Sequence, residues 1–340
     1  MTSSSSVPLR IGILGAARIA RSFVEAVRPS AKVEVAAVAS RDVERATAFA
    51  RELGIGRVHA SYDALFADPD IEAVYVPLPN NLHAEWSIRA AAAGKHVLCE
   101  KPLAANAAQA RAMFAAAEKH GVYLVEAYPY RAQPQTLKVR ELVASGAIGR
   151  VQLIQASFGF PMTDAANIRM DPNLAGGALM DAGSYPVSFV RTVAGVAPSR
   201  VSALARWGAT GVDVGTMATL EYPDGLLAQI SCSFTTARHR HAFIAGDAGS
   251  IATTFFNDTG AAFPPLVDVR RGTGWDAARE VIETEALAGF LAEAESFHDL
   301  VRFGWDRWTG ATAAESIDIA KTLDAIAASS RDGVPVEVER

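Results

Sequence analysis

The first 126 residues alternate continuous apolar runs with helical segments, and this alternation restricts the possible folds more than any other feature. Largely continuous apolar runs are typical of strands whose two faces are both covered by helices. The pattern therefore predicts a doubly wound α/β domain with a parallel sheet. The expected strands are Leu9–Leu14, Val33–Ala39, Ile71–Val76, Val97–Cys99 and Tyr123–Glu126, and the clearest helices between them are Asp42–Leu53, His83–Ala93 and Asn106–His120.

After about residue 150, runs of strand character follow one another with few helices between them. Pro223-Asp224-Gly225 is a strong hairpin turn between two such runs. An antiparallel sheet is expected from the runs Val151–Phe158, Val201–Trp207, Met217–Tyr222, Leu226–Phe234 and His241–Ala245, followed by helices over Ala286–Phe303 and Ala311–Ser330 and an edge strand over Val334–Val338. We therefore expect a disordered tail over residues 1–8, a dinucleotide-binding domain over 9–126, and a substrate-binding and oligomerisation domain over 127–340.

Composition narrows the class of protein. Half of the 340 residues are hydrophobic, which is enough for two packed cores, and the formal net charge of −5 disfavours nucleic acid and anionic membranes as partners. Cys99 and Cys232 are far apart and neither belongs to a CxxC pair, so we expect no disulfide framework and no metal site. The Ser-rich start of the chain lacks the apolar stretch of a signal peptide. These features predict a cytoplasmic protein.

A phosphate-binding turn is expected between the first strand and the first helix. Gly15-x-Ala17-x-x-Ala20 has the placement of a dinucleotide fingerprint, with alanine in place of two glycines. Glycine permits the tight turn, small residues permit a close approach of the backbone, and the helix N-terminus attracts the pyrophosphate. The cofactor residues expected here are Gly15, Ala16, Ala17, Arg18 and Ile19.

The end of the second expected strand favours NADP over NAD. An NAD site places a carboxylate there for the ribose hydroxyls, whereas this strand ends in Ser40-Arg41, with Arg45 one helical turn later. A hydroxyl and guanidinium groups suit a 2′-phosphate. The alternative is that Ser40 caps the next helix and the arginines are simply exposed.

Two segments carry candidate catalytic residues. Glu100 and Lys101 follow a strand, at the carboxyl edge where open α/β sheets bind ligands. Asp181 and Tyr185 are four residues apart, so they would share one face of a helix. Hydride transfer at a carbon bearing a hydroxyl needs a group that exchanges the hydroxyl proton, and a lysine near a tyrosine would lower the pKa of the phenol.

Together these motifs resemble the glucose–fructose oxidoreductase, inositol dehydrogenase and MocA family. The resemblance implies a Rossmann domain, a C-terminal α/β domain with a large open, mainly antiparallel sheet, and pairing across that sheet into dimers or tetramers. It also implies catalytic roles for Lys101 and Tyr185, assisted by Asp181. It rests on Gly15, on Pro77-Leu78-Pro79 followed by His83, on Ala93-Gly94-Lys95-His96-Val97-Leu98 leading into Glu100-Lys101-Pro102, and on the glycine-rich Asp181/Tyr185 segment.

Asn167-Ile168-Arg169, together with Tyr185, is most similar to the branch of NADP-dependent xylose dehydrogenases, trans-dihydrodiol dehydrogenases and sugar ketoreductases. On this basis Arg169 is expected at the substrate, and Tyr128, at the end of the last Rossmann strand, is a second candidate. The further cofactor candidates at the carboxyl edge of the sheet are Pro77, Leu78, Asn80, His83, Glu100 and Lys101.

The expected activity is an NADP-dependent transfer of hydride between the nicotinamide and a carbinol or carbonyl carbon of a sugar or cyclic diol. One alternative is a hydride shuttle between two sugars on tightly bound NADP. Another is a non-catalytic NADP-sensing protein, which the intact set of Lys101, Asp181 and Tyr185 disfavours.

Overall fold

A computed structural model of the chain describes residues 7–339, so most of the predicted tail over residues 1–8 lies outside the described residues. Val7 and Pro8 are described, and their carbonyl groups accept hydrogen bonds from the Arg302 guanidinium at 3.2 and 3.4 Å. The chain is therefore already fixed to the protein two residues before the first strand.

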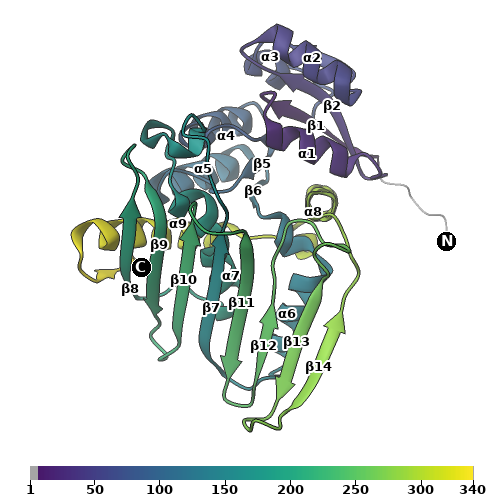
Figure 1. Cartoon of the computed structure of the whole chain (residues 1–340). Helices are drawn as coiled ribbons and strands as arrows, with labels where there is room; N and C mark the ends of the chain where they lie inside the picture. The colour runs from purple at the N-terminus through teal and green to yellow at the C-terminus, as the bar shows by residue number, and fades with distance from the viewer. Residues whose placement is uncertain (1–6, 340) are drawn as a thin grey trace, which may run out of the picture.

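The N-terminal half forms a six-stranded parallel sheet in the order β3-β2-β1-β4-β5-β6, as the alternating pattern predicts (Figure 1). Side chains of β1 alternate between two apolar clusters, one on each face of the sheet. The strands are β1 (Leu9–Leu14), β2 (Val33–Ala39), β3 (Arg57–His59), β4 (Ala73–Val76), β5 (His96–Glu100) and β6 (Leu124–Ala127). The helices are α1 (Arg18–Val27), α2 (Val43–Leu53), α3 (Tyr62–Phe66), α4 (His83–Ala92) and α5 (Ala107–His120).

The ends of α2 and α5 follow the capping chemistry of the sequence. Asn106 accepts a hydrogen bond from the backbone N–H of Gln109, and Gly121 ends α5 in the left-handed conformation. Asp42, not Ser40, caps α2, because the Asp42 carboxylate accepts from the backbone N–H of Arg45. The short elements β3 and α3 were not predicted, because they are too short to show a periodic apolar pattern.

The C-terminal half forms a nine-stranded sheet in the order β14-β13-β12-β11-β7-β10-β9-β8-β15. Strands β7 and β10 are parallel, and the other pairs are antiparallel. This confirms the large, mainly antiparallel sheet, and the short β15 is the expected edge strand. The strands are β7 (Val151–Gly159), β8 (Arg200–Trp207), β9 (Asp213–Glu221), β10 (Leu227–Ser233), β11 (His239–Gly246), β12 (Gly249–Thr253), β13 (Leu266–Arg271), β14 (Ala278–Glu283) and β15 (Val336–Glu337).

Helices cover one face of this sheet and leave the other face open. The helices α6 (Pro134–Ala144), α7 (Ser184–Ala194) and α9 (Ala313–Asp332) lie behind the sheet in Figure 1, while its near face carries no helix. Large apolar side chains stand on the open face, and the strand register places Leu204 opposite Met217. The exposed apolar residues of this face are Leu204, Met217, Leu227, Phe243 and Val281.

The helix α8 (Gly289–Phe303) returns the chain to the N-terminal half. Phe290 and Phe297 are buried in the same apolar cluster as Phe23 and Tyr75, which lie on α1 and β4. Phe290 makes an edge-on ring contact with Phe23, with the ring centroids 6.0 Å apart. A segment distant in sequence thus completes the packing of the Rossmann sheet. None of the helices in residues 7–339 combines the length and the apolar character that a membrane crossing requires.

Candidate active site

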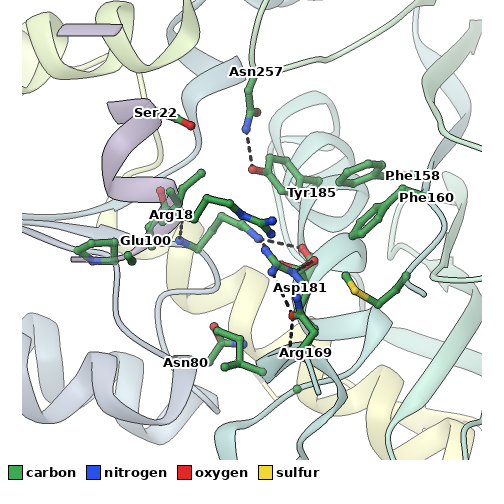
Figure 2. A pocket seen from close by; sticks show the side chains of 18 of the residues that line it. Arg18, Ser22, Asn80, Glu100, Phe158, Phe160, Arg169, Asp181, Tyr185 and Asn257 are labelled. Carbon is green, nitrogen blue, oxygen red and sulfur yellow. Dashed lines mark hydrogen bonds and ion pairs between the residues drawn. The ribbon is translucent and has the colours of Figure 1, made fainter. Parts of the chain in front are cut away.

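A cavity of about 850 Å³ lies between the carboxyl edge of the parallel sheet and the helix-covered side of the large sheet. Figure 2 shows the side chains of both halves of the chain pointing into it. The N-terminal half contributes Ala17, Arg18, Ile19, Ser22, Pro77, Leu78, Asn80, His83, Glu100 and Lys101, and the C-terminal half contributes, among others, Phe158, Phe160, Arg169, Asp181, Tyr185, Arg240 and Asn257.

The turn after β1 has the geometry of a phosphate cradle. Gly15 has a φ of +91°, and a side chain there would also meet Leu78 at 3.2 Å. Helix α1 begins after Ala17, without a side-chain cap and without an acidic residue in its first turn. Its first N–H groups are therefore open to an anion at the cavity wall, where Ala17, Arg18 and Ile19 lie. Gly15 and Ala16 lie directly before these residues.

The residues expected at a 2′-phosphate lie beside this turn and outside the cavity lining. Arg45 donates a hydrogen bond from its guanidinium to the carbonyl of Ala16 at 2.9 Å, so it reaches back to the phosphate turn. Arg41 is exposed, and the hydroxyl of Ser40 accepts from the backbone N–H of Asp42. Asp42 is exposed, and its carboxylate accepts the helix-capping hydrogen bond from the backbone N–H of Arg45 through one oxygen, Oδ1.

The Pro77–His83 segment links the cavity to the C-terminal half. Asn80 donates from its amide to the carbonyl of Ala175 at 2.9 Å. His83 is fully buried, and its two ring nitrogens lie 2.9 and 2.8 Å from the carbonyl oxygens of Pro102 and Leu78. Burial lowers the pKa of His83, although these carbonyls act in the opposite direction. His83 thus holds together two segments of the cavity wall.

An ion cluster joins the two halves of the chain at the centre of the cavity. The Asp181 carboxylate accepts from Lys101 Nζ at 2.8 Å and from Arg169 Nε at 2.7 Å. Burial alone would raise the pKa of Asp181, but Lys101 and Arg169 lower it to about 2. Burial lowers the pKa of Lys101, but Asp181, Tyr185 and Glu100 together outweigh burial, so the pKa of Lys101 is raised. At neutral pH this site therefore holds a carboxylate between two cations.

Glu100 binds the backbone of Lys101. Its carboxylate accepts from the hydroxyl of Tyr75 at 2.5 Å and from the backbone N–H of Lys101 at 3.2 Å. Burial raises the pKa of Glu100. These bonds fix the backbone at the position from which the Lys101 side chain enters the cavity.

Tyr185 lies next to the ion cluster. Lys101 Nζ is 5.0 Å from the centre of its ring, and the phenol oxygen accepts from the amide of Asn257 at 2.9 Å. Burial raises the pKa of Tyr185, while Lys101 and Arg240 act to lower it. In this structure the effect of burial is larger than the expected effect of the lysine, so the phenol is protonated at neutral pH.

Asp181 and Tyr185 do not lie on one regular α-helix, which corrects the expected i, i+4 arrangement. Asp181 belongs to a π-helical turn over Leu179–Gly183, and Tyr185 to the following helix α7. Asp213 of β9 accepts from the backbone N–H of Leu179 at 2.8 Å and so holds this turn. A side chain at Gly177 would come within 2.3 Å of the Asp213 carboxylate, so the glycine is needed here. Both residues still line the cavity.

Comparison with known proteins agrees with this architecture. The family model described as an oxidoreductase family with an NAD-binding Rossmann fold matches residues 9–128, and the GFO/IDH/MocA C-terminal domain matches residues 136–252. The chain belongs to the GFO/IDH/MocA oxidoreductase family. The resemblance stated from the sequence is thus confirmed.

Several members of the GFO/IDH/MocA family are similar over most of the chain. A D-xylose 1-dehydrogenase (NADP⁺) from Haloferax volcanii is 40% identical over 97% of this chain and 100% of its own length. The trans-1,2-dihydrobenzene-1,2-diol dehydrogenase of Mus musculus is 37% identical over 71% of this chain and 73% of its own. The 3-ketoreductase KijD10 of Actinomadura kijaniata, solved with NADP and TDP-benzene, superposes with a TM-score of 0.85 at 33% identity, covering 95% and 98% of the two chains.

One residue expected at the substrate lies elsewhere in this GFO/IDH/MocA protein. Tyr128 is buried behind Tyr185, makes an edge-on ring contact with it, and donates its hydroxyl to the carbonyl of Ser184. It is absent from the cavity lining, so the structure corrects the prediction of a substrate contact. Tyr128 packs against Tyr185 because it directly follows β6, where the chain passes between the two halves.

Sequence reasoning missed Arg240 and Asn257, which both contact Tyr185. The sequence offered one signal for Arg240. Strand alternation placed His239 and His241 on one face of β11, which directs Arg240 to the opposite, helix-covered face. No comparable signal marks Asn257, because it lies in an irregular loop.

We expect Asp181→Asn to lower the free energy of unfolding at neutral pH by about 3 kcal/mol, because it leaves the largely buried Lys101 and the partly exposed Arg169 without their carboxylate. The folded pKa of Asp181, about 2, lies below its ordinary value of 3.8, so its stabilisation is present above that value and disappears as pH falls towards 2. The difference between wild type and variant should therefore narrow from about pH 5 downward. Urea unfolding across this range measures it. Asp306→Asn, on the surface, is the control, and a difference independent of pH would contradict the assignment.

Proposed function

We propose that this protein is an NADP-dependent oxidoreductase that transfers a hydride between the nicotinamide and a carbinol or carbonyl carbon of a sugar or cyclic diol. The observation that carries the proposal is the buried set of Lys101, Asp181 and Tyr185, which faces the same cavity as the phosphate turn. Membership of an oxidoreductase family and the names of its relatives support the same class of reaction.

The residues present fit NADP. The Gly15 turn and the uncapped start of α1 suit a pyrophosphate, and Arg45 with Arg41 suits a 2′-phosphate at the end of β2. Ser40 and Arg41 stand directly at this strand end, where an NAD site places a carboxylate, and Asp42 follows one residue later as the cap of α2. One similar enzyme is named as NADP-dependent and another was solved with NADP.

Bound NADP supplies the hydride donor or acceptor, and the protein handles the proton. Tyr185 gives its phenolic proton to the substrate oxygen during reduction and takes it back during oxidation. Lys101, held as a cation by Asp181, stabilises the negative charge that develops on that oxygen. Arg169 holds the second carboxylate oxygen of Asp181 and lines the substrate side of the cavity.

A hydride shuttle on permanently bound NADP is the second candidate, since residues of both halves of the chain line the cavity and could hold the cofactor in place. NADP that stays with the protein through gel filtration, combined with little activity on added NADP, would favour the shuttle. A non-catalytic NADP sensor has no need of the buried ion cluster, so we place it third.

We expect NADPH to bind more tightly than NADH in isothermal titration. Arg45→Gln should weaken NADPH binding by about 10- to 100-fold, the loss typical of one hydrogen bond to a charged group, and should leave NADH binding unchanged. Arg51→Gln, at the other end of α2, is the matched control. Equal affinity of wild type for the two coenzymes would refute the assignment of the phosphate site.

Replacing Tyr185 by Phe should lower kcat by about 100-fold or more, because the proton donor is removed while the ring contacts are kept. Binding of NADPH should persist, since the phosphate turn is untouched. Steady-state assays with pentoses, hexoses and cyclic diols measure the effect. An unchanged kcat on a good substrate would show that another group moves the proton.

We also propose that the protein is a cytoplasmic homodimer or homotetramer assembled through the open face of the large sheet. The exposed apolar side chains on that face, which the helices leave uncovered, support this assembly. Both cysteines are free and buried, which suits the reducing cytoplasm.

The double variant Leu204→Glu/Met217→Glu should break this assembly, because two paired apolar residues on adjacent strands become charged. Light scattering after gel filtration should give a lower mass than for wild type. Val196→Glu, at an exposed position outside the sheet, should leave the mass unchanged. A wild-type protein that elutes as a monomer would contradict the proposed assembly.

A further inference from the structure

Arg240 is a buried cation that no carboxylate among the described residues approaches within salt-bridge distance. It lies on β11 with 5% of its surface exposed, and none of the salt bridges among residues 7–339 includes it. Its Nε has no hydrogen-bond partner. Aromatic rings surround the guanidinium instead, at centroid distances of 3.9 Å for Tyr185, 4.8 Å for Phe158, 4.9 Å for Phe255 and 5.5 Å for Tyr130.

A buried charge in this position is costly, because no carboxylate in the described part of the chain lies at salt-bridge distance to offset its loss of hydration. Burial lowers the pKa of Arg240 to about 10, which still leaves the group protonated at neutral pH. Aromatic faces attract a cation but do not neutralise it. The ring nearest to the guanidinium belongs to Tyr185, the residue that exchanges a proton in the proposed reaction.

Asn257 connects Arg240 to the phenol oxygen of Tyr185. Arg240 Nη2 donates to Asn257 Oδ1 at 3.2 Å, and Asn257 Nδ2 donates to Tyr185 Oη at 2.9 Å. The backbone carbonyl of Asn257 is fixed in turn by the amide of Gln133 and the N–H of Gly289. Because a guanidinium has only donors, it can form a hydrogen bond with the oxygen of the amide and not with its nitrogen. The amide nitrogen is thereby directed at Tyr185.

We propose that Arg240 is a positioning residue for proton transfer: it orients the Asn257 amide as a donor to the Tyr185 oxygen and keeps a fixed positive charge against the phenol ring. The inference rests on the proposed function, in which the Tyr185 oxygen becomes negative. In that state Oη accepts from Asn257, and the two cations on either side of the reaction, Lys101 and Arg240, share the stabilisation. While Tyr185 is protonated, the same bond from Asn257 leaves its proton free for the substrate.

Other ionisable groups also act on Tyr185. Burial raises the pKa of the phenol, as does Glu100, whereas Lys101 and Arg240 lower it. Among residues 7–339, the ionisable groups that act on Tyr185 or on its neighbouring cations include Tyr75, Glu100, Lys101, Tyr128, Tyr130, Arg169, Asp181, Arg240 and Asp258. Arg240 is the member of this set that touches both the ring and the amide bonded to its oxygen.

The test compares Arg240→Met, which removes the charge, with Arg240→Lys, which keeps it. In the oxidation direction the rise of kcat with pH should move upward by about one pH unit in Arg240→Met, so that kcat at pH 7 falls about 10-fold. Arg240→Lys should recover part of this shift. Asn257→Leu should give a similar shift, and the double variant Arg240→Met/Asn257→Leu should be no worse than the single ones, because both act on one bond. Arg331→Met, at an exposed position of α9, is the control.

A second readout needs no substrate. With carbon-13 at the phenol carbon of tyrosine, the resonance that disappears in Tyr185→Phe reports the ionisation of Tyr185, and its midpoint should rise in Arg240→Met. An unchanged midpoint and an unchanged pH profile would overturn the proposal, whatever happens to kcat. A raised KM with an unmoved profile would also overturn it, and would indicate that Arg240 binds an anionic group of the substrate. If no sugar or diol is oxidised but the midpoint still rises, the proposed function fails, while the contact by which Arg240 lowers the pKa of Tyr185 is supported.

Discussion

The buried contact between Asp181 and the two cations Lys101 and Arg169 is the constraint on which the rest of the site depends. Lys101 comes from the end of a Rossmann strand, and its two partners come from the C-terminal half. Removing one partner of a buried carboxylate strongly destabilises a protein. The contact therefore requires the two halves to meet at this point. The cavity, the phosphate turn at one side of it and Tyr185 at the other are placed by that meeting.

The surrounding fold is arranged to hold this junction still. The π-helical turn that carries Asp181 is held by Asp213 of the large sheet, and Glu100 holds the backbone of Lys101 from the other half. Helix α8 packs its aromatic side chains into the Rossmann core, so the two halves share one apolar cluster. The roles proposed for Lys101 and Tyr185, which come from different halves, require such rigid support, because proton and hydride transfer depend on the separation of the reacting atoms.

The electrostatics of the site divide its ionisable groups into two kinds. Asp181 and Lys101 each keep the other charged, so neither is suited to exchange protons near neutral pH. Tyr185 is left as the neutral donor, because burial raises its pKa despite two neighbouring cations. At neutral pH the site therefore holds a protonated phenol beside the Lys101 cation, which is the arrangement that the proposed carbonyl reduction requires.

The sequence alone determined the Rossmann domain, the phosphate turn at Gly15 and the set of Lys101, Asp181 and Tyr185, because apolar periodicity, turn chemistry and local motifs are properties of neighbouring residues. It did not reveal the short strand β3, the strands β12–β14, the π-helical turn or the burial of Tyr128. Only the tertiary structure brought Arg240 and Asn257 to Tyr185 and α8 to the first domain, since these contacts join residues 55 to more than 200 positions apart. No local pattern encodes such contacts, because they arise when the two sheets and their helices pack together.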